Sequence, residues 1–172
     1  FDIRSSSTTD GTVFDMTVQT GTDSAVTLTI YGTGDISSSV TGGNAAIDVR
    51  AYCTLVLDGG VSIVSDGYGV VAWTNGTVTV NNATITSDAS ALGGNGTNSE
   101  STITVNGGTF TSESSAAVYF PSTKTLDING GTFNGLTGIE VRAGTVTIDG
   151  ATINATGSLS DAKVGGDGPL NN

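Results

Sequence analysis

Apolar and polar residues alternate in short stretches along most of the chain, with a period of two rather than the helical period of 3.6. The stretch Thr102 to Val105 is typical, since its threonines and its apolar residues occupy alternate positions. Alternation of this kind predicts short β-strands with one buried face. The 26 glycines and the many Thr, Ser, Asn and Val residues also disfavour helix. The sequence therefore predicts an all-β fold.

The alternating stretch recurs six times, and its last apolar residue marks one position of a repeat. The successive spacings of this position are 27, 23, 25, 23 and 20 residues. In five of the six repeats Asn or Asp follows at once, and such residues tolerate the positive φ that a corner requires. The marked residues are Ile30, Leu57, Val80, Val105, Ile128 and Ile148.

Two further short strands complete each repeat. The strand after the corner carries one strong apolar residue, and the next strand opens the following repeat. Three short strands in about 24 residues predict a single-stranded parallel β-helix (solenoid) of about six to seven coils, with like residues stacked about 4.8 Å apart. We expect apolar ladders inside and an Asn/Asp ladder at the corner. The apolar residues after the corner are Ile36, Ile63, Ile85, Phe110, Phe133 and Ile153.

The regularity of the repeat sets the expected domain organisation. Residues 1–23 are predicted to form an irregular N-terminal coil or cap, residues 24–156 the parallel β-helix, and residues 157–172 a C-terminal tail or linker. Because the chain opens on Phe1, we expect it to be a mature or excised piece of a longer protein. The single cysteine, Cys53, excludes an internal disulfide.

The repeats also carry a family resemblance. The segments TVTVNNATI, TITVNGGTF and TLDINGGTF resemble the pectin-lyase-like right-handed parallel β-helices, particularly the Asn/Gly/Thr-rich repeats of prokaryotic surface and adhesin-like proteins. The resemblance covers residues 24–156 and implies the fold. It leaves the activity open, because the same superfold carries lyases, hydrolases, adhesins and carbohydrate-binding modules.

The charge of the chain narrows the range of partners. A net charge of −11, with five basic residues and no histidine, would be repelled by phosphate backbones and anionic membrane surfaces, so no nucleic acid partner is expected. No apolar run approaches the roughly 20 residues of a membrane span, so we expect no membrane insertion of this segment. No cofactor is expected. Bound Ca²⁺ stays open, but Asp58, Asp66 and Asp88 are scattered, and no metal site is assigned.

The charged residues do not gather into a catalytic group. Arg50 and Arg142 hold the same place in their coils, but they lie four coils apart, or about 19 Å on the stacking distance. They therefore cannot act on one substrate bond. The pairs Asp48/Arg50 and Glu140/Arg142 are interpreted as exposed ion pairs on one face. We predict that the protein is not an enzyme; a polysaccharide lyase or hydrolase is kept as an alternative.

Two aromatic residues indicate a binding site. Alternation places Trp73 and Tyr119 on the outer face of one sheet, two coils or about 10 Å apart, which is the scale of adjacent sugar rings. Exposed aromatic rings favour the apolar faces of sugars, and Asp48, Glu140 and Arg142 could bond to hydroxyl groups nearby. These five residues are the predicted glycan site. The alternative is that the loop at 93–101 or a neighbouring chain covers the two rings.

The leading hypothesis is a noncatalytic module of the cell surface or extracellular space, serving as an adhesin or stalk and binding a glycan or another cell-surface polymer. One alternative is a subunit that associates end to end into an extracellular filament. Another is an ice-binding protein, because Thr-x-Thr pairs recur on the outward faces of two strands of the repeat. Glycosylation is left open at the sequons of Asn75, Asn82, Asn95 and Asn154.

Overall fold

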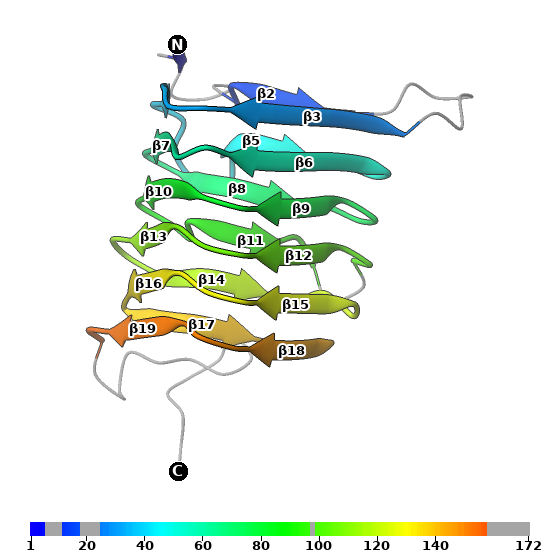
Figure 1. The fold of residues 1–172 in the computed structure, drawn as a ribbon, viewed down its shortest axis with the longest axis vertical. Helices are drawn as coiled ribbons and strands as arrows, with labels where there is room; N and C mark the ends of the chain where they lie inside the picture. Colours follow the sequence, from blue (N-terminus) through cyan, green and yellow to red (C-terminus); the bar gives the residue numbers. More distant parts are fainter. Residues whose placement is uncertain (6–11, 18–24, 97–98, 158–172) are drawn as a thin grey trace.

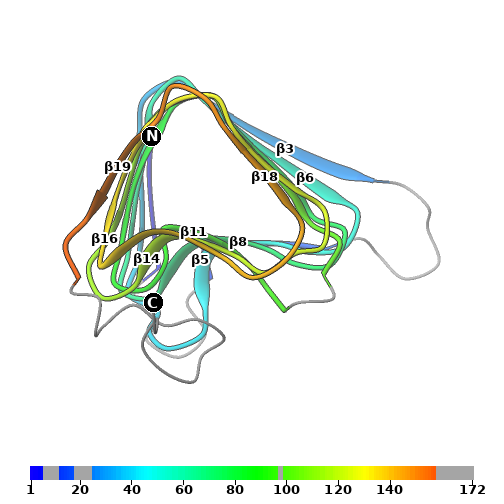
Figure 2. The ribbon, with the colours of Figure 1, turned by 90° about the horizontal axis from the view of Figure 1, so that it is seen from below.

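The computed structural model describes residues 1–5, 12–17, 25–96 and 99–157. These residues form β-strands, turns and loops and no helix, so none of them belongs to a helix that could cross a membrane. The strands are stacked coil upon coil into a column (Figure 1). Viewed along the column, the coils superimpose as a triangle whose three sides are three sheets (Figure 2).

Each described strand pairs in parallel with the equivalent strands of the neighbouring coils. Sheet A contains β1 (Asp2–Ser5), β4 (Asp35–Ser38), β7 (Val61–Ser65), β10 (Ala83–Ser87), β13 (Thr109–Ser112), β16 (Thr132–Gly135) and β19 (Thr152–Ala155). Sheet B contains β2 (Phe14–Met16), β5 (Ala45–Val49), β8 (Tyr68–Ala72), β11 (Leu92–Gly94), β14 (Ala116–Phe120) and β17 (Thr137–Val141). Sheet C contains β3 (Val26–Tyr31), β6 (Cys53–Asp58), β9 (Thr77–Val80), β12 (Thr102–Val105), β15 (Thr125–Ile128) and β18 (Thr145–Ile148). The predicted parallel solenoid with three strands per coil is confirmed.

Apolar columns fill the interior, as the repeat predicted. The six residues from Ile30 to Ile148 that mark the repeat are paired in register through sheet C. The column from Ile36 to Ile153 is likewise continuous through sheet A. Within it the rings of Phe110 and Phe133 stack with centroids 4.9 Å apart and planes 8° from parallel. Because stacking in register buries each residue against its own kind, the solenoid has a continuous core.

An asparagine ladder runs along the corner between sheets C and A, as expected. The Nδ2 of Asn106 donates to Oδ1 of Asn81 at 2.8 Å, and the Nδ2 of Asn129 donates to Oδ1 of Asn106 at 2.9 Å. The central amide, that of Asn106, thus both donates and accepts, which satisfies polar groups at a turn where the backbone leaves the sheets.

Small residues occupy the corner between sheets A and B, just before the inward column of sheet B. A Cβ atom on Gly69 would contact the side chain of Ile85, and one on Gly138 would contact that of Ile153. The positions of Gly69 and Gly138 therefore point inward. Val70, directly after Gly69, points inward as well. Two consecutive inward positions break the strict alternation on which the sequence analysis relied.

The ends of the described chain continue the same pairing. Ile3 pairs with Ile36 and Phe14 pairs with Ile47, so the described parts of residues 1–23 extend sheets A and B. The tail expected over residues 157–172 lies, apart from Gly157, outside the described residues. Cys53 is buried and has no disulfide partner.

Candidate functional site

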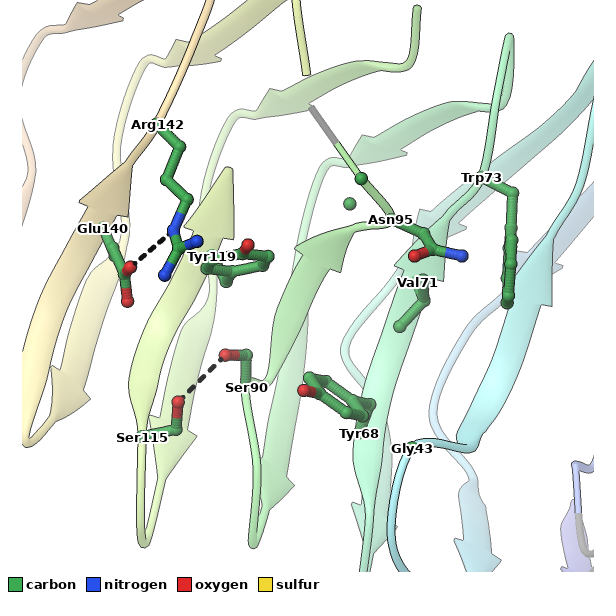
Figure 3. Close-up of a pocket in the computed structure, with 12 residues that line it drawn as sticks. Gly43, Tyr68, Val71, Trp73, Ser90, Asn95, Ser115, Tyr119, Glu140 and Arg142 are labelled. Atoms are coloured by element: carbon green, nitrogen blue, oxygen red, sulfur yellow. Dashed lines mark hydrogen bonds and ion pairs between the residues drawn. The ribbon is translucent and has the colours of Figure 1, made fainter. Parts of the chain in front are cut away.

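An open cleft of about 600 Å³ lies on the outer face of sheet B (Figure 3). It crosses four successive strands, β8, β11, β14 and β17. Aromatic rings, backbone groups and polar side chains share its surface, a mixture typical of small-molecule sites. Its lining residues are Gly43, Tyr68, Val71, Trp73, Ser90, Gly94, Asn95, Gly96, Ser115, Tyr119, Glu140 and Arg142.

One row of outward residues runs along sheet B, and three of its members, Val71, Tyr119 and Glu140, line the cleft. The residues of this row hold the same register position in successive strands of sheet B, so their side chains would stack directly above one another. The row contains one glycine between two larger residues, which leaves a gap in the wall of side chains. From β2 to β17 the row reads Asp15, Asp48, Val71, Gly93, Tyr119 and Glu140.

At one end of the cleft, Trp73 is held by two charged residues of the preceding coil, and a third charged residue holds one of these two. Its indole Nε1 donates to Oδ1 of Asp48 at 2.7 Å. The guanidinium carbon of Arg50 lies 4.7 Å from the centre of the Trp73 ring, within the range of a cation–π interaction. Arg50 in turn donates from Nε to Oδ1 of Asp15 at 2.6 Å. The ring is thus fixed before any ligand arrives.

The exposed ion pair predicted for Asp48 and Arg50 needs correction. Arg50 does reach Asp48, at 3.4 Å, but its shorter bond is to Asp15 in the preceding coil. Asp48 is only 5% exposed. The reason is that Trp73 is hydrogen-bonded to the Asp48 carboxylate, a contact between neighbouring coils that the repeat pattern does not predict. Burial raises the pKa of Asp48, while the bond from Trp73 and the charge of Arg50 act in the opposite direction.

We expect Asp48 to make the stability of the fold depend on pH. Its carboxyl takes up a proton more readily in the folded chain than in the unfolded chain, whose ordinary pKa is 3.8. Through this group the fold therefore gains stability as the pH falls, and the gain is lost as the pH rises through the raised folded pKa. Urea unfolding at a series of pH values should show this pH dependence as a change in the difference in unfolding free energy between the wild type and Asp48→Asn.

The Asp48→Asn variant serves as its own control, because every other carboxylate is shared with the wild type. Stability of the wild type relative to the variant should rise on acidification within the window above pH 3.8. A relative stability that stays constant or falls across that window would contradict the assignment.

At the other end of the cleft, Tyr119 carries a second arginine. The guanidinium carbon of Arg142 lies 5.2 Å from the ring centre, and its Nε donates to Oε1 of Glu140 at 3.0 Å. The ion pair predicted for Glu140 and Arg142 is therefore confirmed. Burial raises the pKa of the Tyr119 hydroxyl, so the ring remains a neutral phenol at neutral pH.

Several lining residues were not predicted from the sequence, and Tyr68 is the largest of them. Tyr68 lies between Val71 and Ser90 along the cleft (Figure 3). Strict alternation from the inward Val70 would have placed Tyr68 inside, but the inward Gly69 shifts the alternation at the corner. The hydroxyl groups of Ser90 and Ser115 lie 3.5 Å apart on the same side of the cleft.

The two aromatic residues predicted from the sequence do line one cleft on the outer face of sheet B. Their register differs, however, because Tyr119 shares a row with Val71 and Trp73 follows two residues later. The two positions are therefore offset by two residues along the strand as well as by two coils along the axis. The distance between them is about 12 Å rather than about 10 Å. Of the loop expected to cover the rings, Gly94, Asn95 and Gly96 line the cleft, while residues 97 and 98 lie outside the described part.

Sheet C presents a different surface, made of threonines. One outward row is threonine in all six coils, and the neighbouring row is interrupted by Val56 and Asp127. Sheet A also carries outward threonines, so β-branched residues that suit exposed strands explain both faces. Ice binding stays a prediction, to be checked by freezing-point hysteresis of the purified protein. The unbroken row is Thr27, Thr54, Thr77, Thr102, Thr125 and Thr145.

In the described part of the chain, no three carboxylate or thiol groups are gathered so that they could hold a metal ion. Comparison of the chain with protein-family models, curated proteins and solved structures found no match. The resemblance to pectin-lyase-like and adhesin-like repeats is therefore supported at the level of the parallel β-solenoid, and its finer part remains a prediction.

Proposed function

We propose that the chain is a noncatalytic, glycan-binding β-solenoid module of the cell surface or extracellular space, acting as an adhesin or stalk. The observation that carries the proposal is the cleft on sheet B, where the rings of Tyr68, Trp73 and Tyr119 lie among hydroxyl, amide and charged groups. Two of these rings belong to the site predicted from the sequence. The rest of that site is Glu140 and Arg142 in the lining, and Asp48 behind Trp73.

The chemistry of this cleft suits sugars. A sugar ring has an apolar face of C–H groups, which packs on an aromatic ring, and a rim of hydroxyl groups, which needs hydrogen-bond partners. Ser90, Asn95 and Ser115 offer donors and acceptors for such a rim. Because Asp48 and Arg50 already hold Trp73, binding costs little side-chain entropy at this ring.

The charged groups favour binding over hydrolysis. Among the described residues that line the cleft, Glu140 is the one carboxylate, whereas glycoside hydrolysis commonly uses a pair of carboxylates on either side of the bond. Glu140 is moreover hydrogen-bonded to Arg142. The alternative of a polysaccharide lyase or hydrolase predicts the release of sugars or unsaturated products, which an activity screen would detect.

The test is a glycan array and pulldown on insoluble polysaccharides, followed by calorimetry on the glycan that binds. Trp73→Ala should weaken that binding about thirtyfold or more, the loss expected for a central aromatic anchor. Tyr31→Ala is the matched control, since Tyr31 is 71% exposed and does not line the cleft. The proposal is abandoned if no glycan binds the wild type, or if Trp73→Ala and Tyr31→Ala bind alike.

End-to-end association into a filament is the second candidate, favoured by apolar residues at both ends of the described solenoid. Phe1 is 53% exposed beside a hollow that Phe14 also lines, and Ile148 and Ile153 are 47% and 44% exposed in the last coil. The edges of parallel sheets can continue onto a second copy, and repetition of one such contact gives a filament. Electron microscopy of the purified chain distinguishes fibres from dispersed short rods.

A further inference from the structure

We infer that the cleft binds a neutral, extended oligosaccharide of about three sugar units, which lies along the solenoid axis with its middle unit at the level of Gly93. This inference rests on the proposed function and names the ligand class of the same site. It draws on the direction of the cleft, on the missing side chain at its centre and on its charge.

The direction follows from the strands that supply the lining. β8, β11, β14 and β17 are successive in sheet B, and their three intervals of about 4.8 Å give a length of about 14 Å. An extended sugar chain advances by roughly 5 Å per unit, which is close to the spacing between strands. A ligand along the axis would therefore meet one coil per unit. Trp73 would lie near its first unit and Tyr119 near its third, so the two rings would not contact the adjacent sugar rings expected from the sequence.

The gap in the outward row supplies the middle position. Gly93 lies between Val71 and Tyr119 in register. A Cβ atom on Gly93 would meet only the carbonyl oxygen of Tyr119 at 3.4 Å and its Cβ at 3.9 Å, which are ordinary contacts. Gly93 also has no positive φ. Among the described residues, neither the backbone nor close packing requires glycine here. Gly93 is itself buried and its neighbour Gly94 lines the cleft, so at this level no outward side chain of β11 stands between Val71 and Tyr119.

The charge of the cleft selects neutral sugars. In the described part of the chain, the lining has one cationic and one anionic side chain, Arg142 and Glu140. They are hydrogen-bonded to each other at 3.0 Å. The cleft therefore carries no excess positive charge for a carboxylated sugar. The net charge of −11 on the whole chain adds long-range repulsion of a polyuronate.

The first experiment measures affinity against ligand length by calorimetry on the full chain. The probes are β-1,4-linked oligosaccharides of glucose, mannose and N-acetylglucosamine from one to six units, with oligogalacturonates of the same lengths as charged counterparts. Affinity for the neutral series that binds should rise up to about three units and then level off. The charged series should bind at least about tenfold more weakly at low salt.

The second experiment closes the gap with Gly93→Val. Valine suits an outward strand position, so the variant should fold, with an unchanged circular dichroism spectrum, and bind the trisaccharide at least about tenfold more weakly. Gly93→Ala adds one methyl group and tests the same point. Its expected loss of affinity for the trisaccharide is smaller. Thr104→Val on sheet C, which replaces an outward hydroxyl group with a methyl group, is the control for an apolar substitution at another outward strand position and should bind as the wild type does.

The outcomes separate the two levels of the proposal. If neither the array nor the pulldown yields any glycan that the wild type binds, the proposed function itself fails. If a glycan binds but affinity levels off at one unit, continues to rise to six, favours the galacturonates, or is unchanged in Gly93→Val and Gly93→Ala, the glycan function stands and the axial trisaccharide site is wrong.

Discussion

Replacing Phe110 with alanine is expected to lower the free energy of unfolding by about 3–5 kcal/mol. Phe110 is fully buried in the sheet A column, and its ring stacks on that of Phe133 in the next coil. The substitution removes the burial of the ring, leaves a cavity that the rigid coils cannot close, and breaks the stack. Urea unfolding followed by circular dichroism measures the loss.

The stack itself can be separated from burial by a double-mutant cycle. Phe110→Leu, Phe133→Leu and the double variant keep most of the apolar volume, and their coupling energy should be about 0.5–1.5 kcal/mol. Val64→Ala on the same sheet is the control, since Val64 is 49% exposed and its loss should stay within about 0.5 kcal/mol. A loss for Phe110→Ala no larger than for Val64→Ala would show that the column is not packed as described.

Placing valine at Gly69 should destabilise the fold by about 3 kcal/mol or more. A Cβ atom at this corner would contact the carbonyl oxygen of Ala91, which belongs to the backbone of the next coil, and would lie 2.5 Å from Cγ2 of Ile85. The side chain of Ile85 could move only into a filled core, and the backbone of Ala91 could move only by shifting the coil. The unfolding midpoint in urea measures the effect.

Gly93→Val is the matched control, because it makes the same change on the next strand of the same sheet. Gly93 points outward and has room for a side chain, so valine there should leave stability within about 1 kcal/mol of the wild type. Equal destabilisation by the two substitutions would contradict the opposite orientations of these glycines.

The three columns of the core were predictable from the sequence because alternation and turn chemistry recur together. In the stretch Thr102 to Val105, two apolar residues at period two can be buried only if the threonines point outward. The asparagine that follows then fixes where the coil turns, so the registers of sheets C and A follow from the spacing alone. The register of a repeat fold can be predicted reliably because the same pattern of residues occurs in each coil.

The candidate site was only partly predictable, because it depends on contacts between coils. Alternation found Trp73 and Tyr119, but it placed Asp48 at the surface and overlooked Tyr68. Asp48 is buried because Trp73 of the next coil is hydrogen-bonded to it. Tyr68 faces out because the inward Gly69 changes the phase at the corner. Both effects arise where coils depart from the repeat, and a pattern derived from the repeat does not contain them.

The equivalent positions of Arg50 and Arg142 give the cleft a defined length. One guanidinium lies against Trp73 and the other against Tyr119, so the two arginines mark the two ends of the site. They are separated by four coils, one more than the three intervals from β8 to β17, because Arg50 contacts Trp73 from the preceding coil, and each coil adds the same rise of about 4.8 Å. The number of coils between the arginines thus determines the length of the cleft. A chain with one coil more or fewer between them would have a cleft longer or shorter by the rise of one coil, without any change to the residues at its ends.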